Sequence, residues 1–185
     1  MNKIVKLSRF FKRIFQVIFY GWPIMLAIIW FQSGAVADTL SQIGLNIANF
    51  VPGYMNMPIF LPLSMEIKMC GFVASFIPAA VGMGIAFCFI RLFEAYQQGE
   101  VFATKSIRYL KKIGAIMLLW ALLNPLYQAL ISLIITWNNP IGQHTILISV
   151  GAHYFSNLIT AGLVFLIAYI MQEGVNLREE QALTV

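Results

Sequence analysis

Residues 69–90 read MCGFVASFIPAAVGMGIAFCFI, without one charged side chain. A helix rises about 1.5 Å per residue, so a helix of this length matches the roughly 30 Å hydrocarbon core of a bilayer. In lipid, a helix also satisfies its backbone hydrogen bonds within the segment itself. The stretch therefore predicts a membrane-spanning helix.

Three further crossings follow from the neighbouring apolar runs. One run goes from Ile14 to Phe31, and no charged residue stands between Ile113 and Glu173. This second interval can cross the bilayer twice, with a turn over residues 138–142, because Asn, Pro and Gly interrupt helices there. The sequence thus predicts an all-α membrane protein: a bundle of four transmembrane helices over residues 14–31, 70–93, 113–137 and 151–172, in one domain over residues 1–185.

The composition agrees with a membrane protein. Apolar residues make up 60% of the 185 residues and charged residues 10%, whereas soluble domains carry about a quarter charged residues. The net charge of +5 could suggest nucleic acid, but 11 of the 12 Lys and Arg residues flank apolar runs, as topology determinants do. We therefore expect no direct binding of nucleic acid.

The distribution of Lys and Arg predicts the orientation. Five precede the first span, five lie between Arg91 and Lys112, one lies in residues 32–68 and none lies around Asn138. Since cytoplasmic loops carry the excess of basic residues, segments 1–13, 94–112 and 173–185 are expected in the cytoplasm and residues 32–68 outside. The expected location is the bacterial plasma (inner) membrane, with several crossings and both termini in the cytoplasm.

An alternative for the first run is a secretory signal cleaved after Ala37. A basic start, an apolar run and the small residues Ala35-Val36-Ala37 fit such a signal, although the run is long for that role. We therefore interpret the first apolar run as a membrane helix that is retained in the protein.

The two halves of the chain resemble each other weakly. Arg9–Ile14 and Arg108–Ile113 both lead into a span with basic and aromatic residues. Two parallel helical-hairpin repeats would explain this, and so would the general likeness of basic-flanked spans. Residues 59–67 and 145–150, each before the second span of its half, could form a short external strand pair, and residues 40–50 an external amphipathic helix.

Chemistry inside the membrane has few candidate groups. The apolar runs 14–31, 69–90 and 113–172 hold no Asp, Glu, Lys or Arg, which disfavours an enzyme or a proton-coupled transporter. A candidate intramembrane polar cluster consists of Asn124, Gln128, Asn157 and Thr160. This cluster could serve either to pack helices against each other or to bind a ligand, and the sequence leaves both alternatives open.

Metal and cofactor binding are not expected. His144 and His153 lack neighbouring carboxylates or cysteines, so they predict no metal site. Cys70 and Cys88 fall in one predicted helix, about 27 Å apart at 1.5 Å per residue, so they cannot pair. No cofactor motif is present, and we expect none to bind.

The cytoplasmic segments offer a candidate interaction surface. Thr104 is expected to cap a helix that continues into the third span. Basic residues of that helix could meet anionic lipid, and the acidic tail could fold against them or against a partner. The candidate residues are Lys105, Arg108, Lys111, Lys112, Glu173, Glu179 and Glu180.

The segment Leu92–Phe102, with Thr104 and the basic run Arg108–Lys112, resembles a bacterial family of membrane proteins, and so does the tail Glu173–Val185. The family is catalogued as a domain of unknown function, number twenty-nine seventy-five. The resemblance implies location in a membrane and assigns no catalytic or binding residue. It also implies a cytoplasmic partner, a small helix-turn-helix regulator.

The function predicted from these observations is a non-enzymatic regulatory or interaction component. Its expected partners are the lipid bilayer, the small helix-turn-helix regulator and further copies of itself. One alternative is a membrane protection or immunity protein against an antimicrobial peptide or toxin, recognised by residues 32–68. A small transporter subunit is a further alternative.

Overall fold

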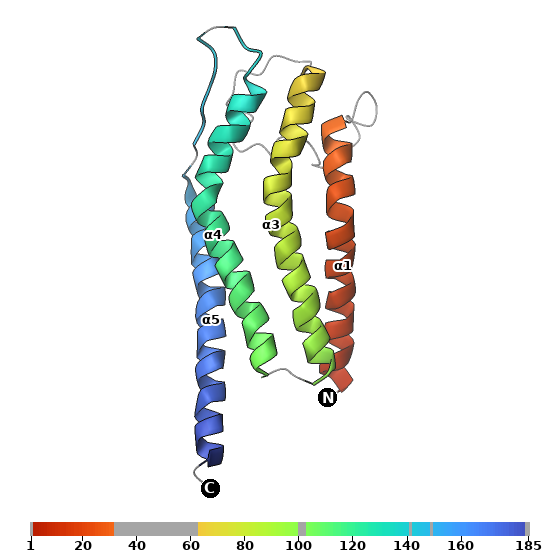
Figure 1. Ribbon diagram of the computed structural model, residues 1–185, viewed down its shortest axis with the longest axis vertical. Helices are drawn as coiled ribbons and strands as arrows, with labels where there is room; N and C mark the ends of the chain where they lie inside the picture. The colour runs from red at the N-terminus through yellow and green to blue at the C-terminus, as the bar shows by residue number, and fades with distance from the viewer. Residues whose placement is uncertain (1, 32–62, 100–102, 141, 149, 184–185) are drawn as a thin grey trace. The chain divides into compact units, whose positions relative to one another are not determined.

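Four long helices dominate the computed structural model, which describes residues 2–31, 63–99, 103–140, 142–148 and 150–183 (Figure 1). The helices are α1 (Asn2–Phe31), α3 (Met65–Gln97), α4 (Thr104–Ile135) and α5 (Ala152–Leu183). All four are long and apolar enough to cross a membrane. The prediction of an all-α, four-helix membrane protein is confirmed.

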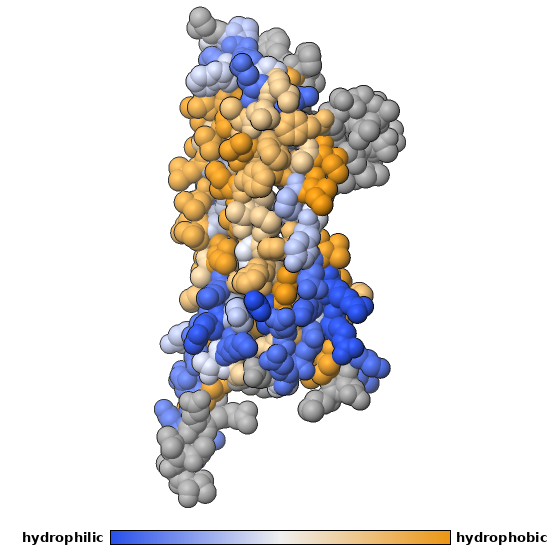
Figure 2. Space-filling model, turned by 45° about the vertical axis from the view of Figure 1, so that its right-hand side comes forward, coloured by the Kyte–Doolittle hydropathy of each residue, from blue (hydrophilic) through white to orange (hydrophobic). Residues whose placement is uncertain are grey.

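Each helix is longer than the span predicted for it. The basic flank before residue 14 belongs to α1, and the acidic tail after residue 172 belongs to α5. At about 1.5 Å per residue, the 32 residues of α5 extend for about 48 Å, well beyond a hydrocarbon core of about 30 Å. Figure 2 shows one face of the molecule on which apolar side chains give way to hydrophilic ones toward the helix ends.

Hydrogen bonds at the N-termini of α3 and α4 show where each helix begins. Ser64 precedes α3, and its hydroxyl accepts a hydrogen bond from the amide of Ile67 at 3.4 Å, as an N-cap residue does. The Ala103 carbonyl accepts from the amide of Ile107 at 3.3 Å. Ala103 therefore holds the N-cap position of α4 and Thr104 is its first helical residue, so the prediction that Thr104 caps this helix was wrong by one position.

Three of the helices contain a proline, namely Pro23 in α1, Pro78 in α3 and Pro125 in α4. A proline inside a helix removes one backbone hydrogen bond and strains the preceding turn. Membrane helices tolerate this because neighbouring groups satisfy the freed carbonyl.

The contacts of the chain divide it into two compact units. The first unit contains Met1–Tyr20, Val81–Ala121 and Ala152–Val185, and the second contains Gly21–Ala80 and Leu122–Gly151. Helices α1, α3 and α4 each contribute to both units. In these three helices the proline lies three, two and four residues from the boundary residues Tyr20, Ala80 and Ala121, so each boundary falls where the helix is locally weakened.

Aromatic stacking and a small apolar core hold the first unit together. Phe15 of α1 stacks on Phe89 of α3 with ring centres 4.5 Å apart, and Phe11 stacks on Phe93 at 5.6 Å. The buried core consists of Cys88, Leu92 and Ile113. A Cβ added at Gly114 would lie 3.0 Å from the backbone of Phe165, so this glycine permits the close approach of α4 and α5.

A buried tryptophan organises the second unit. Trp30 of α1 has no exposed surface, and its indole N–H donates to the Ser75 hydroxyl of α3 at 3.0 Å. A Cβ at Gly71 would lie 2.1 Å from the Trp30 ring. The missing side chain of Gly71 therefore makes the space in which the indole packs.

The connection between α4 and α5 covers residues 136–151 and so contains the predicted turn at residues 138–142. Gly142 adopts a φ of 92°, a left-handed conformation that favours glycine. The segment after it is fastened to the end of α4. The amide of Leu147 donates to the Ser132 hydroxyl at 2.9 Å, and the amide of Thr145 donates to the Thr136 hydroxyl at 3.2 Å.

These contacts correct the predicted strand pair. The residues that the structure describes contain no strand. Met65–Ile67 form the first turn of α3, because Ser64 caps a helix there. A strand would give the amides of Thr145 and Leu147 to a neighbouring strand, but here they donate to the side chains of Thr136, directly after α4, and of Ser132 in α4. Residues 59–62, the predicted amphipathic helix at residues 40–50 and the cleavage position after Ala37 lie outside the described residues.

Candidate functional site

The predicted intramembrane cluster begins with a pair on α4. The amide nitrogen of Gln128 donates to the side-chain oxygen of Asn124 at 2.6 Å, one helical turn away. Gln128 is buried, with 5% of its surface exposed. Pro125 between them leaves the carbonyl of Ala121 without its usual helical donor, so this turn gathers polar groups inside an apolar helix.

Asn157 and Thr160, the other two members, belong to α5 in the first unit, whereas Asn124 and Gln128 belong to the second. Both side chains are exposed. The Thr160 hydroxyl donates to the Ser156 carbonyl of its own helix at 2.8 Å. This local bond satisfies the hydroxyl without another helix. The Asn124–Gln128 pair is thus the part of the predicted cluster whose contact the structure describes.

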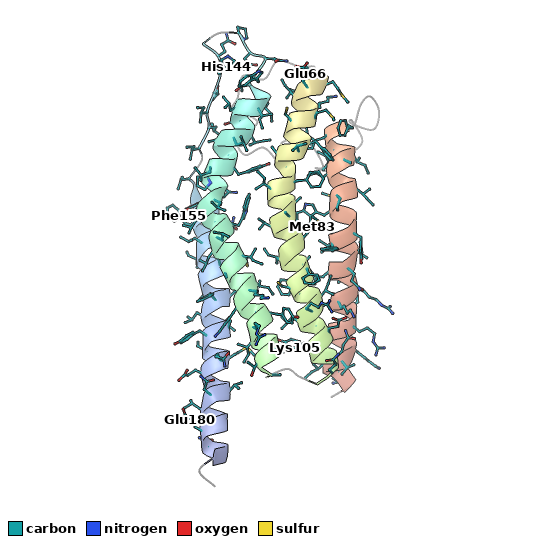
Figure 3. The ribbon with its side chains drawn as sticks, in the orientation of Figure 1. Glu66, Met83, Lys105, His144, Phe155 and Glu180 are labelled. Atoms are coloured by element: carbon teal, nitrogen blue, oxygen red, sulfur yellow. The ribbon has the colours of Figure 1, made fainter. Side chains whose placement is uncertain are left out.

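Three of the four candidate basic residues on α4 are exposed, namely Lys105, Arg108 and Lys112. Figure 3 labels Lys105 near the start of the helix. Lys111 is half-buried, and its ammonium lies 5.7 Å from the ring centre of Tyr169 on α5. A cation over an aromatic face is attracted by the ring quadrupole. Lys111 therefore contacts α5 through an aromatic ring.

The candidate acidic residues follow the predicted end of the fourth span, in the last turns of α5. Glu173 and Glu180 are exposed, and Figure 3 shows Glu180 near the C-terminal end of the helix. The side chain of Glu179 lies outside the described part of the structure. Nearby, the amide of Gln172 donates to the Asn176 side chain at 3.0 Å, a contact one turn apart that supports helix in this region.

Sequence reasoning missed an ion cluster that joins α1 to α3. The ammonium of Lys12 lies 2.8 Å from one oxygen of Glu94, and the guanidinium of Arg91 lies 3.0 Å from the other. In the sequence, Lys12 is one of the five basic residues before the first span, which indicate the topology. One signal was available, namely that a carboxylate at a span end is expected to pair with a basic residue.

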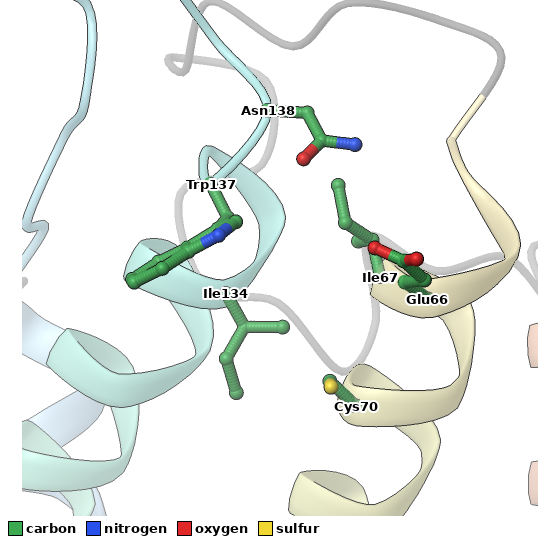
Figure 4. Close-up of a pocket in the computed structure, with 6 residues that line it drawn as sticks. All are labelled: Glu66, Ile67, Cys70, Ile134, Trp137 and Asn138. Atoms are coloured by element: carbon green, nitrogen blue, oxygen red, sulfur yellow. The ribbon is translucent and has the colours of Figure 1, made fainter.

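The second unit contains a cavity of about 290 Å³ that the sequence also did not predict (Figure 4). Its walls come from the first turns of α3 and from the end of α4 with the residues that follow. The lining residues are Glu66, Ile67, Cys70, Ile134, Trp137 and Asn138. The amide nitrogen of Asn138 donates to the Ser64 hydroxyl at 2.9 Å and so links the two walls.

The described side chains offer no metal-binding group. Among them, no three His, Cys, Asp or Glu residues gather closely enough to hold an ion. Cys70 and Cys88 are both free thiols of α3.

A family model described as "Protein of unknown function (DUF2975)" matches residues 20–185. The chain belongs to this family. No curated protein and no solved structure matches it. The DUF2975 match covers α3, α4, α5 and the last part of α1, and so includes every residue of the sites described above except Lys12.

Proposed function

We propose that this DUF2975 protein is a non-enzymatic interaction component of the bacterial inner membrane that docks a cytoplasmic partner on the C-terminal part of α5 and the first turns of α4. The observation that carries this proposal is the continuation of α5. Its last eleven residues, 173–183, stay helical beyond the predicted end of the span and expose Glu173 and Glu180. A charged helix that leaves the membrane offers a surface for a soluble protein.

The distribution of charge supports a cytoplasmic position for these elements. Among the described residues of the second unit, Lys68 is the single Lys or Arg, whereas the other basic residues lie in the first-unit parts of α1, α3 and α4 and, for Arg178 alone, in α5. Since basic residues are retained in the cytoplasm, the N-terminal part of α1 and both ends of the α3–α4 connection belong there. The C-terminus of α5 follows, because four crossings return the chain to the side on which it began.

The proposed partner is a small DNA-binding regulator of the helix-turn-helix class. Two observations support this partner. One is the family resemblance, and the other is the opposite charge of the exposed residues on α4 and α5. Exposed Lys105 and Arg108 on one helix and exposed Glu173 and Glu180 on the other would orient a partner that carries both charges. Charge complementarity of this kind mainly sets specificity and the rate of association.

A site-specific cross-linking experiment tests this function. A photoreactive amino acid replaces Leu177, which is 51% exposed near the end of α5, in the full chain expressed in its host. The matched control carries the same group at Ile159, which is 63% exposed in the apolar part of α5. We expect a cytoplasmic protein cross-linked at position 177 and lipid alone at position 159. The same protein at both positions, or lipid alone at both, would contradict the proposal.

A charge-reversal variant tests whether cross-linking of the partner depends on the acidic residues of α5. Replacing Glu173 and Glu180 by Lys leaves the helix propensity nearly unchanged but reverses these two charges on the α5 part of the docking surface. The yield of the product at Leu177 should fall severalfold, and Lys6→Glu on α1 should leave it unchanged. Equal yields in all three proteins would show that the charged end of α5 does not recognise the partner.

A further inference from the structure

The cavity of the second unit combines features that suit a particular ligand. Glu66 is exposed at its edge, and among the described residues its carboxylate has neither an ion pair nor a hydrogen bond. Asn138 uses its amide nitrogen for Ser64, and its oxygen faces the cavity in Figure 4. Trp137 supplies an aromatic wall. An anion, a neutral oxygen acceptor and an aromatic face together favour a cation that donates hydrogen bonds.

We propose that this cavity binds the primary ammonium headgroup of a phosphatidylethanolamine molecule. An ammonium group has three N–H donors and no acceptor, so it can donate to Glu66 and to Asn138 at the same time. Hydrogen bonds between ionised groups are about twice as strong as neutral ones. The indole of Trp137 adds a cation–π attraction.

The size of the cavity also suits a headgroup. Its volume of about 290 Å³ lies at the lower end of the range for small-molecule pockets, which begins near 300 Å³. A headgroup fills such a space, and the acyl chains must lie elsewhere.

The apolar surface next to the cavity indicates where the acyl chains of the lipid lie. Such a surface favours a lipid over a soluble amine as the ligand. Cys70, Val73 and Ile77 follow Glu66 at intervals of four, seven and eleven residues, which places them on one face of α3. Val73 is 65% exposed and Ile77 is 47% exposed. On α4, Leu130 lies one turn before Ile134 and is 42% exposed. An acyl chain against these side chains would keep the headgroup at the cavity, an advantage that a free amine lacks.

Native mass spectrometry of the full chain in mild detergent tests the proposal. The delipidated protein is titrated with phosphatidylethanolamine, with the same lipid acetylated on nitrogen, and with phosphatidylglycerol. The acetylated lipid keeps its chains and phosphate but loses the positive charge. We expect one tight site for phosphatidylethanolamine that neither of the other lipids occupies at the same concentration.

Two variants locate the site. Glu66→Gln should weaken phosphatidylethanolamine binding about tenfold, as expected for the loss of one charge-assisted hydrogen bond. Glu173→Gln, which removes an exposed carboxylate from α5, should leave the affinity unchanged. Trp137→Leu keeps an apolar wall and should weaken binding by a smaller factor.

Several outcomes would overturn the proposal. Equal binding of the acetylated lipid would exclude recognition of the ammonium, and an unchanged affinity in Glu66→Gln would exclude this cavity. Displacement of the lipid by free phosphoethanolamine at equal concentration would show that a soluble amine, without chains, is the true ligand.

Discussion

The ammonium of Lys12 lies 2.8 Å from a carboxylate oxygen of Glu94, which joins α1 to α3 across 82 residues of sequence. The two side chains are 22% and 35% exposed, so the pair is partly withdrawn from solvent. The guanidinium of Arg91 lies 3.0 Å from the second oxygen of Glu94, so this one carboxylate pairs with two cations. Together with the stacked rings of the first unit, this ion cluster fixes the pairing of α1 with α3.

A double-mutant cycle measures this contact. Lys12→Met, Glu94→Gln and the double variant are unfolded by denaturing detergent, and their free energies of unfolding are compared with that of the parent protein. Because the pair is partly exposed, we expect a coupling energy of about 0.5–1 kcal/mol. Strictly additive effects would mean that Lys12 and Glu94 do not interact in the folded protein.

The packing of Trp30 against Gly71 gives a second prediction. In Gly71→Ala the new Cβ would meet the indole at 2.1 Å, and overpacking of this kind costs about 1–3 kcal/mol. Gly84→Ala is the matched control on the same helix, because its nearest neighbour would lie at 3.9 Å, an ordinary contact distance. Thermal unfolding should show a lower midpoint for Gly71→Ala than for Gly84→Ala. Equal unfolding midpoints would show that the Trp30 indole does not pack against Gly71.

The hydrogen bonds from Ser132 and Thr136 predict how the α4–α5 connection behaves. Ser132→Ala removes the acceptor of the Leu147 amide, a bond of 2.9 Å, and should cost about 1 kcal/mol of local stability. Hydrogen exchange at Leu147 should accelerate severalfold. Thr160→Ala, which removes an exposed hydroxyl bonded within α5, should leave that rate unchanged. No acceleration in Ser132→Ala would show that its hydroxyl does not hold this segment.

The number of helices and their class could be predicted because long uncharged runs leave few alternatives in lipid. The helix ends were harder to predict. The charged residues before Ile14 and after Gln172 ended the predicted spans, yet both flanks continue the helices, since charge excludes a residue from hydrocarbon but not from a helix. Hydropathy marks the membrane boundary, whereas capping groups such as Ser64 mark the helix boundary.

The candidate site was predicted less well for a related reason. Asn124 and Gln128 stand one turn apart, so their bond could be anticipated from helical spacing. The cavity joins Glu66 to Asn138, and the ion cluster joins Lys12 to Glu94; both depend on which helices are neighbours. Hydropathy and charge do not specify that pairing. The local signal for the cavity was Glu66, an acidic residue just before the uncharged run at residues 69–90.

The proposed docking surface requires the end of α5 to lie on the cytoplasmic side of the membrane, and accessibility to a thiol reagent measures this position. Cys70 and Cys88 are replaced by Ser and Ala, and a single cysteine is introduced either at Leu177 or at Asn138, both exposed. A thiol reagent that cannot cross the inner membrane is then applied to spheroplasts. A cytoplasmic end of α5 predicts labelling at position 138 in intact spheroplasts and at position 177 only after lysis. Labelling at position 177 in intact spheroplasts would contradict a cytoplasmic docking surface on α5.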